Sequence, residues 1–424
     1  MLRDRFDNEI STESAAAGDR YVLATDQLLA GEPDMVPQFE AVVAADPGFA
    51  LGHSGLARAR MISSDPAGAR SAAAEAEALA ESLPAREASH VAALSLLIKG
   101  KTAEAYRAAR AHVADYPRDV LVAQTCTSVY GLIGFSGQPG REAELLAYTS
   151  TLQPHYGEDW WFLSQHAFSL CETGQIARAE AAIERSLTQR PRNAHGAHVR
   201  SHVFYEAGEH DAGAAWLADW LRDCDRGAIM HGHLSWHGAL WALEAGNLDR
   251  VWASLDADVA PGGAEGPPLI VMTDTASLLY RIELAGETVP PERWQAVSGY
   301  AKRFFPKPGL GWADVHAALA HAMAGDSEAL EGIAAHPVGP AADLVRAFAE
   351  AFRAIAAQDW PEASGHLIAA LADHARIGGS RAQRDLLEFS LLNVLLKEGK
   401  AEEARRLLAL HRPALADRRT VKGL

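Results

Sequence analysis

The stretch that decides the fold runs from Gly174 to Pro191 and reads "GQIARAEAAIERSLTQRP". Its glycine can adopt the left-handed backbone that ends a helix, and its proline stops the helix that follows. Between them, apolar residues recur at helical spacing, and the small side chain of Ala179 lets two helices approach closely. The spacing therefore predicts two antiparallel helices that meet at a tight glycine turn.

The same punctuation returns in other parts of the chain. "GKTAEAYRAARAHVADYP" repeats it with Gly100, Ala105 and Pro117, and "GKAEEARRLLALHRP" begins it again with Gly399 and Ala404. Single helix pairs of this size cannot bury their apolar faces, so consecutive pairs stack on one another. The pattern resembles the tetratricopeptide repeat. We therefore predict an all-α fold, a tetratricopeptide-repeat-like α-solenoid in which antiparallel helix pairs form a right-handed superhelix.

The repeats are expected to form a single helical-repeat solenoid over residues 1–424. Flexible segments are expected at its two ends, residues 1–20 and 416–424. The Pro/Gly-rich stretches "APGGAEGPP" (260–268) and "FPKPGLG" (305–311) are predicted to be loops between repeats and not linkers between domains.

The composition excludes several classes of protein. Hydrophobic residues make up 48% of the chain and charged residues 22%, which is enough apolar material for a buried core. The net charge of −16 would repel phosphate backbones and anionic lipids, so neither nucleic acid nor membrane is an expected partner. Cys126, Cys171 and Cys224 form no CxxC pair, and no apolar signal-type or membrane-spanning segment occurs. A cytoplasmic protein is expected.

Five further segments resemble one family in their content and order. They are "DPGFALGH" (46–53), "REASHVAAL" (86–94), "HLSWHGAL" (233–240), "TASLLYRIELAG" (275–286) and "IGGSRAQRD" (377–385). The chain resembles the tetratricopeptide repeat protein 38 family over most of its length. The resemblance implies an all-helical solenoid with a curled cavity, and it implies no particular activity.

Histidines concentrate on two neighbouring helices of the predicted solenoid. In tetratricopeptide repeats, the first helix of each pair lines the concave surface. Counted back from the turn glycines Gly208 and Gly246, five histidines fall on or beside the inward side of such helices. They are His195, His198, His202, His233 and His237. We therefore expect several imidazoles to share one cavity.

Two HxxxH pairs stand out in this group, His198 with His202 and His233 with His237. Residues four positions apart lie on one face of a helix, within reach of a single ion. The two pairs could hold a divalent transition metal, because neutral imidazole suits Zn, Cu, Ni and Fe. Glu206 could add an oxygen ligand. Three interpretations stay open: structural packing, a metal-free ligand or catalytic site, and a metal site.

Other candidate residues belong to the same predicted surface or to the family segments. His90 and Glu87 fall on the inward side of an earlier helix, and Trp236 adjoins the histidine cluster. Asp274 and Arg281 share one helix face two turns apart. They could form a solvated ion pair or a clamp between repeats, or Arg281 could hold an anionic substrate.

The remaining histidines and one loop have simpler interpretations. His316 has the register of His237 and is a candidate site residue, although it points away from the nearby Asp314. His166 and His321 are predicted to be structural, and His210, after a turn, to be exposed. Ser380 in "GGSRAQRD" should cap a helix whose first N–H groups could bind an anion.

The preferred hypothesis is a His-rich concave cavity that binds a small molecule and could support acid/base or metal-assisted chemistry. The alternative is a protein-interaction scaffold that binds a peptide or helix in its concave groove, the usual role of such repeats.

Overall fold

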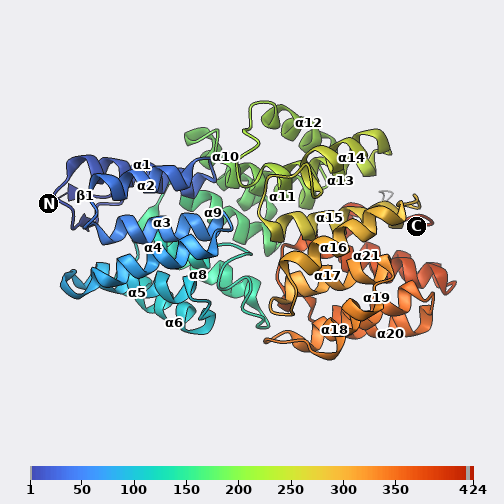
Figure 1. Ribbon diagram of the computed structural model, residues 1–424. Helices are drawn as coiled ribbons and strands as arrows, with labels where there is room; N and C mark the ends of the chain where they lie inside the picture. The colour runs from blue at the N-terminus through green and yellow to red at the C-terminus, as the bar shows by residue number, and fades with distance from the viewer. Residues whose placement is uncertain (1, 417–420) are drawn as a thin grey trace. The chain divides into compact units, whose positions relative to one another are not determined.

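The computed structural model describes residues 2–416 and 421–424 (Figure 1). The chain divides into two compact units. The first unit comprises Met1–Gly134, Ala143–Arg200 and Cys224–Met230, and the second comprises Phe135–Glu142, Ser201–Asp223 and His231–Leu424. The prediction of one continuous solenoid over residues 1–424 stays a prediction.

Helices dominate the first unit. Its elements are β1 (Leu2–Arg3), β2 (Glu9–Ile10), α1 (Ala15–Ala30), α2 (Met35–Ala45), α3 (Ala50–Ile62), α4 (Pro66–Ala78), η1 (Ala80–Ser82), α5 (Ala85–Ile98), α6 (Thr102–Asp115), α7 (Val120–Ala123), η2 (Gln124–Cys126), most of α8 (Arg141–Tyr156), α9 (Trp160–Glu172) and α10 (Ile176–Gln189). Helix α11 (Ala194–Ala207) begins in this unit and ends in the second.

The second unit is helical in the same way. Its further elements are α12 (His210–Leu221), α13 (His231–Glu244), α14 (Leu248–Ser254), η3 (Leu255–Val259), α15 (Pro268–Leu284), α16 (Pro291–Phe304), α17 (Gly311–Ala324), α18 (Ser327–Ala335), α19 (Ala342–Ala356), α20 (Trp360–Leu371), η4 (His374–Ile377), α21 (Arg381–Lys397), α22 (Ala401–His411) and η5 (Pro413–Leu415). None of the described helices has both the length and the apolar composition that crossing a membrane requires.

The glycine turn works as the sequence predicts. Gly174 ends the α9 segment with φ of 78°, and its N–H donates to the carbonyl oxygen of Cys171 at 2.9 Å. Gly100 and Gly399 also have positive φ. The alanines that follow these three turns, Ala105, Ala179 and Ala404, are all completely buried. Consecutive helices therefore pack as antiparallel pairs, such as α5 with α6 and α9 with α10 (Figure 1), and the all-α prediction is confirmed.

The two helices of a pair differ in their contact with water. Every residue of α9 is buried, whereas α10 buries one side only. The same holds for α15, which is buried without a break from Val271 to Ile282, against its partner α16. Polar side chains on the first helices of the pairs must therefore find partners inside the protein.

The two ends of the described chain make defined contacts. Strands β1 and β2 pair antiparallel, and the Ser11 N–H donates to the Glu87 carboxylate at 2.9 Å. The expected tail, 416–424, lies partly outside the described residues, and in the described part the Lys422 N–H donates to the Leu284 carbonyl at 2.9 Å. Flexibility of either end stays a prediction.

Candidate functional site: a buried imidazole cluster

Two helices supply the imidazole cluster. Helix α11 carries His198 and His202 one turn apart, and α13 carries His233 and His237 in the same spacing. The ligand nitrogens of the three that lie in the second unit, His202, His233 and His237, are within 4.8 Å of one another, and all four histidine side chains are buried. Within the second unit, the structure thus brings His202 together with the predicted pair of His233 and His237.

Within the second unit, His237 is the middle of the cluster. Its ring lies 4.7 Å from the His202 ring and 5.0 Å from the His233 ring, measured between centroids, and both contacts are edge-on. Burial lowers the pKa of His237 well below the usual histidine value, and the neighbouring rings of His202 and His233 lower it further. The His237 imidazole is therefore neutral at physiological pH, the form that binds metals.

Asp274 orients one member of the cluster. Its Oδ2 accepts a hydrogen bond from Nδ1 of His233 at 2.6 Å, and both side chains are buried. Burial raises the pKa of Asp274 above the usual aspartate value, while the His233 imidazole acts in the opposite direction. A carboxylate on Nδ1 fixes the tautomer and leaves Nε2 as the electron-donating nitrogen.

Trp236 packs against the cluster, as its position beside His237 suggests. Its indole stacks on the His233 ring at 5.2 Å with only 9° between the planes. Among the described residues, its Nε1–H has no hydrogen-bond acceptor. The indole therefore restrains the His233 ring from one side and carries a buried donor that a ligand could use.

Arg281 does not pair with Asp274. It lies above the Phe389 ring at 4.6 Å, and its Nη2 is 3.9 Å from Oε1 of Glu244. No described residue accepts a hydrogen bond from its Nη1. Because Arg281 is buried, it does not form a solvated ion pair with Asp274, and both a clamp between repeats and a role in holding an anion stay predictions.

A second group of buried polar side chains lies in the same unit, and no sequence pattern predicted it. Asp385 accepts hydrogen bonds from Tyr205 at 2.7 Å and from Arg412 at 2.9 Å. Arg412 also binds both oxygens of Glu206, at 2.7 and 3.0 Å. The suggestion that Glu206 adds an oxygen ligand to the cluster is therefore wrong, because this carboxylate already neutralises a buried arginine.

Two predictions about isolated side chains have different outcomes. His210 is not exposed as predicted, because its ring is buried and its Nδ1 lies 2.5 Å from Glu244. Ser380 caps α21 as predicted and forms a capping box with Gln383. The N–H groups of both cap residues are satisfied within this box, which leaves the predicted anion site without those donors.

His316 lies apart from the cluster. Its Nδ1–H donates to the Trp312 carbonyl at 2.8 Å, and burial lowers its pKa to about 4. Asp314 instead accepts from the Gly309 N–H at 3.0 Å, so the two do not pair, as expected. His166 and His321 have buried hydroxyl partners, Thr149 at 3.1 Å and Ser298 at 2.8 Å, in agreement with structural roles.

His195 and His90 belong to the first unit. His195 lies against Gly31, and burial together with the charge of Arg58 lowers its pKa to about 4. The Nδ1 of His90 lies 2.9 Å from Asp119, and no described residue bonds to its Nε2.

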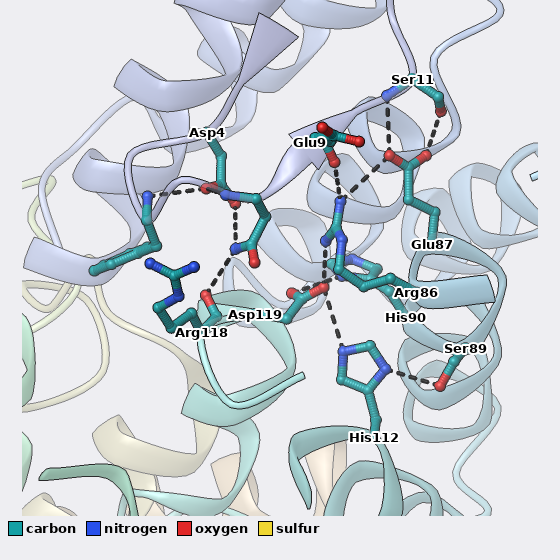
Figure 2. A network of polar contacts seen from close by, with 12 residues as sticks. Asp4, Glu9, Ser11, Arg86, Glu87, Ser89, His90, His112, Arg118 and Asp119 are labelled. Atoms are coloured by element: carbon teal, nitrogen blue, oxygen red, sulfur yellow. Dashed lines mark hydrogen bonds and ion pairs between the residues drawn. The ribbon is translucent and has the colours of Figure 1, made fainter. Parts of the chain in front are cut away.

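Figure 2 shows that His90 is part of a network that the sequence did not reveal. Asp119 also contacts His112 Nε2 at 3.3 Å and Arg86 Nη1 at 2.6 Å. Burial raises the pKa of Asp119, but His90, His112 and Arg86 together bring it well below the usual value. No sequence pattern predicts the contact between His90 and Asp119, because the two residues are 29 positions apart and Asp119 lies in the segment between α6 and α7.

Comparisons with known proteins bear on the fold. No family model matches the chain. A human IFIT1 dimer with m7Gppp-AAAA is similar, at 14% identity and a TM-score of 0.45, over 98% of this chain and 96% of that one. Yeast Tom70 has 13% identity and a TM-score of 0.35 over 94% and 91% of the two chains. The TPR domain of P58(IPK) has 15% identity and a TM-score of 0.20 over 94% and 99%. The structure itself shows an all-α helical-repeat protein built from antiparallel helix pairs.

Proposed function

We propose that the protein binds a divalent transition metal through the imidazoles of His202, His233 and His237, with His198 one turn along α11 as the fourth ligand. The observation that carries this proposal is that the ligand nitrogens of three buried histidines of the second unit, His202, His233 and His237, lie within 4.8 Å of one another. Imidazole nitrogens bind such ions at about 2 Å, so ligands around one ion stand roughly 3 to 4 Å apart. Small ring rotations would bring the nitrogens to that spacing.

The electrostatics of the site favour a metal over a cluster of protonated rings. Three positively charged imidazoles this close would repel one another, and burial already keeps His237 neutral. Asp274 supports the same conclusion, because a carboxylate that holds the remote nitrogen of a ligating histidine is a usual part of metal sites. Neutral ligands would leave the ion's charge uncompensated, which is the condition for a Lewis acid or for acidifying bound water.

Arg281 suggests the chemical class of the small molecule. It stands seven residues after Asp274 on α15, about 10 Å along the helix axis. Its unused Nη1 donor fits a substrate whose anionic group lies at about that distance from the reacting atom. The site would then perform metal-assisted chemistry on a small anionic molecule.

The His233–Asp274 pair favours a second candidate, acid/base chemistry without a metal. A histidine held by a buried carboxylate is a competent general base at Nε2. The alternative of a protein-interaction scaffold stays a prediction, and no contact among the described residues specifically favours it.

Membership of the tetratricopeptide repeat protein 38 family is also our proposal. The segments that carry the resemblance include six of the buried polar side chains described above: Glu87, His90, His233, His237, Arg281 and Asp385. A cytoplasmic location is proposed because none of the three cysteines forms a disulfide and because the net charge is negative.

The test is metal analysis of protein purified without added metal and without an affinity tag of histidines. We expect stoichiometric transition metal, or stoichiometric uptake of Co²⁺ with the absorption bands of a nitrogen-ligated ion. The double variant His202→Ala/His237→Ala should lose this binding, and His155→Ala, which changes an exposed histidine on α8, should retain it. Unchanged Co²⁺ uptake by the double variant would contradict the metal proposal.

A further inference from the structure

We infer a binding site for a small amphipathic amine in a cavity of the second unit, between α20, α21 and α22. The cavity has a volume of about 340 Å³. Most of its wall is apolar, and Glu388 lies at its polar end. The volume is at the lower end of the range for small-molecule pockets, which indicates a ligand and not a folded partner.

The apolar wall of the cavity would bind the hydrocarbon part of the ligand. Leu371, Phe389, Leu392, Leu395 and Leu408 contribute to it from three different helices. Ile368 also lines the cavity and is 55% exposed, an unusual position for a large aliphatic side chain. Covering this surface with a hydrocarbon group would remove it from water, at a gain of roughly 25 cal/mol for each Å².

Glu388 provides the recognition group. The nearest imidazole nitrogens to its carboxylate are His374 Nε2 at 3.5 Å and His411 Nδ1 at 3.8 Å, both farther than a normal hydrogen bond. Burial raises the pKa of Glu388, but His374, Arg412 and His411 bring it below the usual glutamate value. The carboxylate is therefore ionised and can still accept from a ligand.

The charges around the cavity favour a cation over an anion. Arg412 lines the cavity, but Glu206 and Asp385 already bind its guanidinium. Glu403 adds a second carboxylate to the lining. A ligand ammonium would therefore meet a net negative surface, whereas a ligand carboxylate would be repelled by Glu388. This site shares no residue with the imidazole cluster, and so it does not depend on the metal proposal.

Three probes with the same hydrocarbon chain separate the possibilities: octylamine, octanol and octanoate. At pH 8 the amine is protonated and the acid is ionised. Calorimetric titration should give an affinity for octylamine at least about tenfold higher than for octanoate, with octanol between them. Octanoate binding as tightly as octylamine, or no binding of any probe, would overturn the proposal.

Two variants and one control complete the experiment. Glu388→Gln keeps the shape of the side chain and should weaken octylamine binding about tenfold while leaving octanol binding unchanged. Ala372→Trp, at an exposed position that lines the cavity, should abolish binding of both probes. Glu402→Gln, on the exposed side of α22 and paired with Arg405, should change neither. Octylamine binding that Glu388→Gln leaves intact in a folded protein, checked by circular dichroism, would refute the role of the carboxylate.

Discussion

The contact between His233 and Asp274 fixes the tautomer and the orientation of one ring in the imidazole cluster. A neutral imidazole can present either of its two ring nitrogens to a ligand. The Asp274 carboxylate removes this ambiguity for His233, because it takes the Nδ1–H at 2.6 Å. The Trp236 ring, stacked at 5.2 Å, restricts rotation of the same imidazole. The resulting preorganisation is what a metal or a proton acceptor requires.

Replacing Asp274 with Asn should weaken metal binding without removing any ligand. The amide keeps the size of the side chain but cannot hold the Nδ1–H with a charge, and such changes lower metal affinity roughly 10- to 100-fold. Competition against a chromophoric chelator measures the change. Asp249→Asn, at an exposed position of α14, is the matched control. Equal affinity in Asp274→Asn and wild type would show that Asp274 has no part in binding.

At the scale of elements, two glycines distinguish the effect of backbone conformation from the effect of side-chain packing. A Cβ added at Gly174 would meet no atom within 4 Å, yet its φ of 78° is one that L-residues rarely adopt. Gly299, in the middle of α16, also has open space around it, but no positive φ. For a substitution by alanine, the two positions therefore differ in φ and not in the space around the new Cβ.

Alanine at these two positions should change stability in opposite directions. Gly174→Ala should lower the free energy of unfolding by about 1 kcal/mol, because the turn forces alanine into the left-handed region. Gly299→Ala should raise it by roughly 0.5 to 1 kcal/mol, because alanine is the better helix former. Urea titrations monitored by circular dichroism give both values. Stabilisation by Gly174→Ala would mean that the turn is not held in the observed conformation.

The elements also show where sequence patterns suffice. Helical periodicity and turn glycines predict α9 with α10 and α5 with α6, because both signals are local. The phase of the histidines within α11 and α13 is equally local, and three of the five predicted histidines, His202, His233 and His237, lie together in the second unit. The prediction that His210 is exposed is wrong because its partner Glu244 lies on another helix. A pattern within one helix cannot show such a partner.

At the scale of the whole molecule, sequence patterns predict the class of fold better than the networks inside it. The buried partners Asp119 of His90 and Arg412 of Glu206 come from distant segments, and their spacing carries no periodic signal. The cavity beside Glu388 escapes prediction for a related reason, since it is space that the three helices leave unfilled. The stacking of helix pairs determines which helix faces pack together, but the volumes of the side chains determine where a cavity is left between them.

Buried titratable groups outside the imidazole cluster link the stability of the protein to pH. Burial is the first cause of the lowered pKa, to about 4, of three histidines: His195, His316 and His321. Between pH 6.5 and 4, the unfolded chain binds more protons at these rings than the folded chain, so the free energy of unfolding falls as the pH falls. Burial raises the pKa of Asp314 and Asp385 to about 6, and these two carboxyl groups act in the opposite direction. The histidines have the larger summed effect.

His316→Gln tests this linkage at one position, because His316 is not a proposed metal ligand. A histidine with a folded pKa of about 4 and an unfolded pKa of about 6.5 costs the folded state roughly 2 kcal/mol on going from pH 7 to pH 5. The loss of unfolding free energy between these two pH values should therefore be about 2 kcal/mol smaller in His316→Gln than in wild type, whatever the variant's stability at pH 7. His366→Gln, at a partly exposed ring on α20, should leave the loss unchanged. Urea titrations of metal-free protein at both pH values measure it, and an equal loss in His316→Gln and wild type would mean that water reaches the His316 ring and hydrates its charged form.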